Sequence, residues 1–329
     1  MSGAGLFVVV NHTAARARMA WPKVREALKR AGVEFEAHES TRQGETEERT
    51  RAALESGFET VAAVGGDGTL SAAANGFFES CLELSEGSLP RAVNPSAALA
   101  VLPAGTGDDF ARGLSGGRRA PLEVWVSKLI RHCRGEAPQE ETLKRLDLML
   151  GSVDGGARRS ICLNAATLGI GAEVAARVAA QGRAVRSLPG EARFALAALP
   201  RLAAWRDRRV RVTADGRVWE ECGTNLLAVV NGTYAGGGMN LSPRASLTDG
   251  LLDVLAVADI SRPALLRELS RVHTGGHIKS PHVKLTRAAH VRVETLDSAD
   301  PLGVEADGDV RGQTPAEFQV MPAALNVVF

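Results

Sequence analysis

Two glycine-rich segments, each placed directly after an apolar run, constrain the fold of this chain most. Residues 65–69 (GGDGT) follow the β-rich run 60–64, and residues 103–110 (PAGTGDDF) follow the run 98–102. Both precede stretches of helical composition, so each segment predicts a tight strand-to-helix turn. Glycines let the backbone approach a ligand closely, and a helix N-terminus offers unpaired N–H groups to a phosphate. One such loop is more often a plain turn, but two at one edge of a parallel sheet favour a site for phosphate and metal.

The first 145 residues alternate strand and helix patterns. The expected strands are residues 6–10, 33–38, 60–64 and 98–102, and the expected helices are residues 21–31, 46–55 and 70–78. Because strands alternate with helices in this order, the pattern predicts an α/β fold with a doubly wound parallel sheet.

After residue 145 the pattern changes to short β-rich runs. They are residues 146–150, 160–164, 210–213, 226–230, 252–257, 283–285 and 291–293. Asp215 and Gly216 separate two of these runs, and Asp-Gly is a strong hairpin signal. Residues 190–205 form the clearest helical pattern inserted among them. This part predicts a mostly antiparallel β domain, so a chain of 329 residues is expected to hold two domains.

Charge and composition exclude several classes of function. The 39 basic and 38 acidic side chains give a net charge of +1, which argues against a nucleic-acid partner. The N-terminus has no basic region typical of a signal peptide, and no apolar run reaches the roughly 18 residues of a membrane span. We therefore expect a cytoplasmic protein.

The common nucleotide-binding plans do not match. The chain has no GxxxxGK[ST] segment, and residues 169–171 (GIG) lack the third glycine of a dinucleotide-binding fingerprint. A P-loop and a Rossmann dehydrogenase are therefore disfavoured.

The glycine-rich segments resemble motifs of one family. Residues 65–69 are similar to the GGDGT signature of the diacylglycerol kinase catalytic domain, and residues 103–112 (PAGTGDDFAR) to its PxGTxNDxAR segment, which NAD kinases lack. The resemblance continues through residues 231–237, 243–253 and 307–309. It is strongest to the soluble bacterial lipid kinase branch, which implies a nucleotide-binding domain over residues 1–145 and a β-sandwich lipid-substrate domain over residues 146–329.

The resemblance also implies roles for individual residues. An ATP site would be lined by Asn11, Thr41, Gly65, Gly66, Asp67, Gly68, Thr69, Gly105, Thr106 and Asp109. Within this set Asp67 and Asp109 would form, together with Asp147, an acidic network around Mg²⁺.

Two further roles are implied for the second half of the chain. Asp249, with backbone carbonyls near Ser246 and Leu251, matches a second, structural metal site of some bacterial members. Asp307 lies where the family has its proposed general base, a group that accepts the proton of the attacking alcohol.

The resulting expectation is an ATP- and Mg²⁺-dependent kinase that transfers the γ-phosphate to a hydroxyl of a diacylglycerol-like lipid. One alternative is an NAD kinase-like small-molecule kinase that shares only GGDGT. Another is a degenerate nucleotide-binding regulatory protein, because residues 11–15 lack the proline and glycine of the family's first loop and Asp108 replaces its asparagine.

The expected partner is the lipid substrate, and nucleic acid is not expected. Seven arginines in residues 183–209 suggest peripheral contact with an anionic membrane surface. The sequence leaves the oligomeric state open, and a homodimer is one of the states considered.

Overall fold

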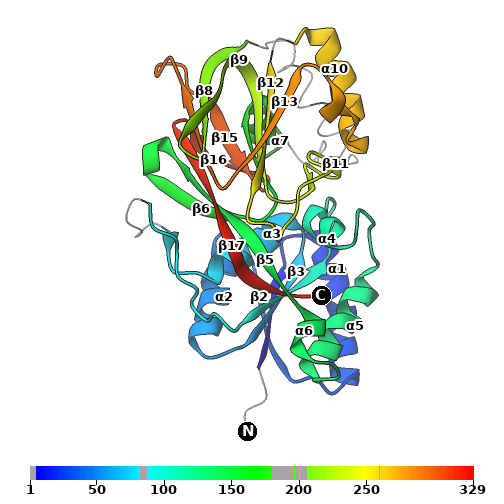
Figure 1. The fold of residues 1–329 in the computed structure, drawn as a ribbon. Helices are drawn as coiled ribbons and strands as arrows, with labels where there is room; N and C mark the ends of the chain where they lie inside the picture. The colour runs from blue at the N-terminus through cyan, green and yellow to red at the C-terminus, as the bar shows by residue number, and fades with distance from the viewer. Residues whose placement is uncertain (1–4, 82–86, 180–195, 197–199, 201–205, 259) are drawn as a thin grey trace. The chain divides into compact units, whose positions relative to one another are not determined.

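The chain divides into two compact units. The computed structural model describes residues 5–81, 87–179, 196, 200, 206–258 and 260–329. Unit 1 comprises Met1–Leu148 and Pro322–Phe329, and unit 2 comprises Met149–Met321 (Figure 1). The expected boundary after residue 145 lies close to this division. The expected second domain, however, included residues 322–329, which return to unit 1 because the last strand ends there.

A parallel sheet forms the centre of unit 1. Its strands are β1 (Leu6–Asn11), β2 (Phe35–Ser40), β3 (Thr60–Gly65) and β4 (Ala98–Pro103). They lie in the order β2-β1-β3-β4, and every pairing is parallel. All six residues of β3 are buried, as expected for a strand covered on both faces. The predicted α/β fold of this part is confirmed.

Helices cover both faces of this sheet. They are α1 (Ala15–Arg30), α2 (Glu45–Glu55), α3 (Asp67–Gly76), α4 (Asp109–Leu114), α5 (Leu122–Cys133) and α6 (Gln139–Thr142). Helix α1 contacts α5 on one face, and α2 contacts α3 on the other (Figure 1). Helix α1 begins before the predicted start at residue 21, because the alanine- and arginine-rich residues 15–20 also favour a helix.

Unit 2 is mostly antiparallel. Its strands are β5 (Leu143–Val153), which begins in unit 1, β6 (Arg158–Cys162), β7 (Ala165–Gly169), β8 (Arg208–Ala214), β9 (Arg217–Val230), β10 (Tyr234–Ala235), β11 (Met239–Asn240), β12 (Leu252–Ala258), β13 (Val283–Ala288), β14 (His290–Thr295), β15 (Gly303–Ala306), β16 (Asp309–Gln313) and β17 (Ala316–Val328), which ends in unit 1. Strand β9 pairs antiparallel with β7, β8 and β12. The predicted mostly antiparallel domain is therefore confirmed.

Two Asp-Gly turns connect strands of unit 2. The predicted hairpin at Asp215 and Gly216 joins β8 to β9, and both residues have positive φ, 47° and 78°. A second turn of the same type, Asp307 and Gly308 with φ of 50° and 92°, joins β15 to β16. Positive φ at both central residues is what a tight type I′ hairpin requires.

Strands and two helices supply the core of unit 2. Its largest cluster includes the buried side chains of Leu227, Val254, Val291 and Phe318. Helices α7 (Ile170–Ala179) and α10 (Arg262–Arg271) pack through a smaller apolar cluster. The helix expected over residues 190–205 lies almost entirely outside the described residues. Among the described residues, no helix is long and apolar enough to span a membrane.

Candidate functional site

The two glycine loops of unit 1 touch each other through their backbones. A Cβ atom on Gly105 would lie 2.5 Å from the Cα of Gly66, a distance that real Cβ atoms essentially never show. The amide of Ala104 donates a hydrogen bond of 2.8 Å to the carbonyl of Gly65. Glycine is needed here because the two turns approach so closely. The structure thus brings both predicted loops together at the carboxyl ends of β3 and β4.

The end of β1 joins this group. The Asn11 side chain donates through Nδ2 to Oγ1 of Thr69, at 3.0 Å. The same Oγ1 would lie 2.3 Å from a Cβ on Gly65, so this glycine is needed for the Thr69 hydroxyl to fit. Predicted residues from β1, β3 and α3 therefore form one connected group.

Two carboxylates line a pocket between the loops. Asp67 accepts a hydrogen bond from the amide of Phe110 at 3.1 Å, and Asp108 accepts one from the amide of Gly105 at 2.8 Å. The pKa of Asp108 is raised, chiefly because burial disfavours its anion and also because Asp67 is nearby. The pocket is lined by Ala63, Gly65, Gly66, Asp67, Leu70, Val101, Pro103, Asp108 and Ala111. Sequence reasoning selected Asp109 and missed Asp108, which the loop geometry places in the lining.

Two arginines bind the second glycine loop. Arg119 donates to the carbonyls of Thr106 and Gly107, and Arg16 donates to the carbonyl of Gly105 at 3.0 Å. Both are exposed, so their positive charge lies beside a loop suited to an anion. Sequence reasoning missed them because they approach the loop from 13 and 89 residues away in the chain.

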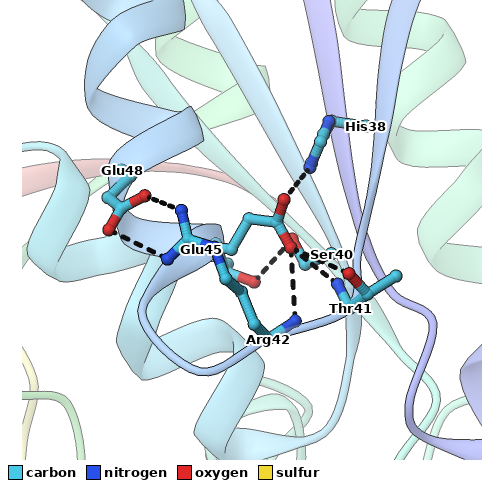
Figure 2. Close-up of polar contacts among 7 residues, drawn as sticks. His38, Ser40, Thr41, Arg42, Glu45 and Glu48 are labelled. Atoms are coloured by element: carbon cyan, nitrogen blue, oxygen red, sulfur yellow. Dashed lines mark hydrogen bonds and ion pairs between the residues drawn. The ribbon is translucent and has the colours of Figure 1, made fainter.

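Thr41 lies at the same edge of the sheet, in the turn after β2 (Figure 2). Its amide donates to Oε2 of Glu45 at 2.7 Å, and His38 contacts Oε1 of the same carboxylate at 3.0 Å. These contacts, the Thr41 amide first among them, lower the pKa of Glu45 to about 2. Because β1 separates β2 from β3, Thr41 follows a strand two places away from the strand that bears the first glycine loop.

The remaining acidic residues predicted for Mg²⁺ are buried within unit 1. Asp109 begins α4 and is 4% exposed, and Asp147 is 3% exposed and accepts the amide of Ala323 at 2.7 Å. Among the described residues, no group of three or more His, Cys, Asp and Glu side chains could hold a metal ion. Asp67, Asp109 and Asp147 thus do not form a ready-made metal cage, although the pocket carboxylates offer the oxygen ligands that Mg²⁺ prefers.

In unit 2, Asp307 anchors a turn. Its carboxylate accepts backbone hydrogen bonds from Leu163 at 2.7 Å, Asn164 at 2.9 Å and Ala165 at 3.4 Å. Asp215, in the other Asp-Gly hairpin, does the same by accepting amides of Ala289 and His290. Asp307 therefore has a structural task beside the catalytic role predicted for it.

The residues predicted for a second metal site lie in the loop before β12. Ser246 contacts the hydroxyl of Thr248 at 3.3 Å, and the amide of Leu251 donates to Oδ1 of Asp249 at 3.2 Å. The other oxygen of Asp249 accepts a hydrogen bond from Arg287. This arrangement does not fit a divalent cation, because a guanidinium already binds the carboxylate.

The described part of the predicted membrane-facing arginine group is paired with acidic residues. Arg206 and Arg208 lie 2.6 and 2.9 Å from Asp300, and Arg209 lies 3.3 Å from Glu221. Arg183, Arg186, Arg193 and Arg201 lie outside the described residues.

Comparison with known proteins decides the family. The diacylglycerol kinase catalytic domain matches residues 5–137, and the YegS C-terminal NAD kinase beta sandwich-like domain matches residues 167–329. The chain belongs to the diacylglycerol kinase family. It is therefore a member of a family of lipid kinases and a phosphotransferase by descent, as the GGDGT and PAGTGDDFAR segments predict.

Individual relatives extend over nearly the whole chain. The chain is 31% identical to "Probable lipid kinase YegS-like" of Pseudomonas aeruginosa (strain UCBPP-PA14), over 92% of this chain and 86% of that protein. It is 25% identical to the diacylglycerol kinase of Bacillus subtilis (strain 168), over 93% and 89%. A solved diacylglycerol kinase structure from Bacillus anthracis str. Sterne shares the fold, with a TM-score of 0.65, 18% identity and coverage of 99% and 97%.

Proposed function

We propose that the protein transfers the γ-phosphate of ATP to a hydroxyl of a diacylglycerol-like lipid, with Mg²⁺ bound at the phosphates. The observation that carries this proposal is the backbone contact between the two glycine loops, with Asp67 and Asp108 lining the pocket there. Membership of the family supports a kinase. The acceptor follows from relatives named diacylglycerol kinase.

The loops are suited to hold phosphates. No side chain caps the N-terminus of α3, so backbone N–H groups and the positive end of its dipole are available to an anion. Arg16 and Arg119, fixed to the carbonyls of the second loop, would add positive charge. Phosphoryl transfer depends mainly on such positioning and charge neutralisation.

Mg²⁺ fits the chemistry of the pocket. Bound with ATP, it would neutralise charge developing on the phosphates. Asp67 and Asp108 would hold it, since Mg²⁺ is usually bound by one or two carboxylates together with phosphate oxygens. Asp109 and Asp147, which the sequence assigns to the same network, would support these two from their buried positions in unit 1.

Asp307 is proposed to accept the proton of the lipid hydroxyl. Its backbone hydrogen bonds fix the carboxylate in one orientation, which a positioned general base requires. We further propose that the protein acts peripherally at membranes from the cytoplasm, where its lipid substrate lies.

The activity is tested with γ-labelled ATP, Mg²⁺ and mixed micelles containing diacylglycerol. We expect label in the lipid, and we expect Asp67→Ala and Asp307→Ala to abolish it. The control for Asp307→Ala is Asp215→Ala, which removes a carboxylate that also accepts backbone amides, in the other Asp-Gly turn. Equal loss of activity in both variants would mean that Asp307 acts only through the fold.

A pair of glycine variants tests the phosphate cradle without disturbing the fold. A Cβ on Gly68 or Gly113 meets no atom within 4 Å, so both alanine variants are expected to fold. Gly68 lies in the first turn of α3, and we expect only Gly68→Ala to weaken ATP binding measured by calorimetry.

Incubation of the protein with NAD and γ-labelled ATP separates the alternative functions. Label in NADP would replace the lipid proposal with an NAD kinase activity, and ATP binding without transfer would indicate a regulatory module.

A further inference from the structure

Two carboxylates share one guanidinium in unit 2: Asp249 in the loop before β12, and Asp253 in β12 itself. The antiparallel register of β12 and β13 places Asp253 directly opposite Arg287. The Nε of Arg287 donates to Oδ1 of Asp253 at 2.9 Å, and its Nη2 donates to Oδ2 of Asp249. Asp253 is 5% exposed, so its charge is largely withdrawn from water.

All four oxygens of these carboxylates have a donor. On Asp253, Arg287 binds Oδ1 and the Ser242 hydroxyl binds Oδ2. On Asp249, Arg287 binds Oδ2 and the amide of Leu251 binds Oδ1. A divalent cation that coordinated either carboxylate would therefore compete with donors already bound to it, and next to Asp249 and Asp253 it would meet the positive charge of Arg287.

The burial of Asp253 favours a positive charge at this place, although the Asp249 side chain is 31% exposed. A carboxylate removed from water is costly unless it is paired and hydrogen-bonded. The two carboxylates would also repel each other without a cation between them. A planar guanidinium suits this task, because its N–H groups point at two acceptors at once.

We infer that Arg287 is the resident cation of these two carboxylates, and that unit 2 holds residues 242–253 in place without a divalent metal. The side chain extends from β13, a strand already fixed against β12 by six paired positions. The pairing of β12 with β13 therefore positions the guanidinium beside the carboxylates, and this positive charge is present whenever unit 2 is folded. This inference concerns the stability of unit 2 and does not depend on the proposed kinase activity.

Thermal unfolding of the full chain tests the inference, without nucleotide, in EDTA and in millimolar Mg²⁺ or Ca²⁺. For the wild type we expect the same midpoint in all three solutions. For Arg287→Ala we expect a midpoint lower by several degrees in EDTA and a partial recovery with the divalent cation, which would then enter the vacated place between the carboxylates.

Arg292 offers a matched control in the same unit. Its guanidinium bridges Glu294 and Glu317, and its side chain is 43% exposed, against 44% for Arg287. The carboxylates of this control pair are 32% and 37% exposed, whereas the Asp253 side chain is 6% exposed. We therefore expect a smaller shift for Arg292→Ala and no recovery with cations, so that any effect of cations on unit 1 cancels in the comparison.

Two results would overturn the inference. One is a wild-type midpoint that rises with Mg²⁺ or Ca²⁺ and loses this rise in Asp249→Asn, because a metal would then bind beside Arg287 or in its place. The other is an Arg287→Ala midpoint equal to that of the wild type in EDTA. If Arg287→Ala does not fold in any solution, Arg287→Lys decides: a midpoint insensitive to EDTA supports an internal cation, and a midpoint that requires the divalent ion contradicts it.

Discussion

The acidic side chains of the two units are bound by different kinds of group. In unit 1, Asp67 and Asp108 receive hydrogen bonds from backbone amides and line a pocket. In unit 2, Asp249 and Asp253 are bound by the guanidinium of Arg287. Amides orient a carboxylate but leave its charge in place, whereas a guanidinium cancels it. The first arrangement therefore suits a site that takes up an external cation with its ligand, and the second suits a loop that must only remain folded.

The largest expected effect is in unit 1, for Gly105→Ala. The new Cβ would lie 2.5 Å from the backbone of Gly66, which cannot move aside as a flexible side chain could. Overpacking of this kind typically costs about 1–3 kcal/mol. We expect the free energy of unfolding, measured in urea, to fall by an amount near the upper end of this range. We also expect loss of ATP binding, measured by calorimetry.

The control for this prediction is Gly113→Ala in the adjacent helix α4. Its Cβ meets no atom within 4 Å, and alanine is a better helix former than glycine. Stability should be unchanged or slightly higher, with ATP binding retained. Similar losses in both variants would show that the contact between the glycine loops is not what matters.

The next effect, in unit 2, compares the two Asp-Gly turns. Asp307→Ala leaves part-buried backbone amides without their acceptor, at a cost of about 1–3 kcal/mol for a buried donor left unsatisfied. The two amides that Asp215 accepts are exposed, so water can replace the carboxylate there. In urea unfolding we expect Asp307→Ala to lower the free energy of unfolding by about 2 kcal/mol and Asp215→Ala to lower it less. Both variants should keep ATP binding, because both changes lie outside unit 1. Loss of ATP binding in either variant would contradict the expectation that ATP binding depends on unit 1 alone.

The smallest effect is a difference in pH dependence. Burial, opposed by hydrogen bonds from Thr167 and Gly308 and reinforced by Asp307 and Asp309, raises the pKa of Glu305 to about 7. A pKa raised by folding gives stability that is present below about pH 4.5 and is lost as pH rises through 7. For Glu45, whose pKa is lowered to about 2, stability is present above pH 4.5 and is lost as pH falls through 2.

Urea midpoints measured across these pH ranges distinguish the two carboxyls. Relative to the wild type, Glu305→Gln should gain stability between pH 5 and 8, and its amide can still bond both Thr167 and Gly308. Glu45→Gln should lose stability at neutral pH, and that difference should shrink as pH falls from 4.5 to 2. Parallel pH profiles for the two variants would contradict the opposite signs.

Local patterns predicted the elements that depend on nearby residues. The strands β1, β3 and β4 are continuous apolar runs, and the hairpin at Asp215 follows from the Asp-Gly preference. The same signal occurs at Asp307 and could have revealed the hairpin between β15 and β16. Strand β17 was missed because Pro322 interrupts its pattern and because its two ends serve different units.

For the candidate site, too, local patterns did not predict the features that depend on residues distant in the chain or on the course of the backbone. The sequence selected both glycine loops and assigned the metal role to Asp109, because Asp108 stands where the family has an asparagine. That the side chain of Asp108 also lines the pocket depends on a backbone turn, with φ of 52° at Asp108, which the resemblance does not specify. Arg16 and Arg119 were missed because their partners are distant in the chain.

By itself, the sequence determined the family, the α/β and antiparallel halves and the two glycine loops, because each depends on short runs whose local conformational preferences are strong. Only the tertiary structure decided which residues from distant parts of the chain come into contact. The backbone contact of Gly66 with Gly105 and the place of Arg287 between Asp249 and Asp253 arise from strand order and register. These are long-range properties, fixed by which apolar faces pack together, and no local pattern specifies them.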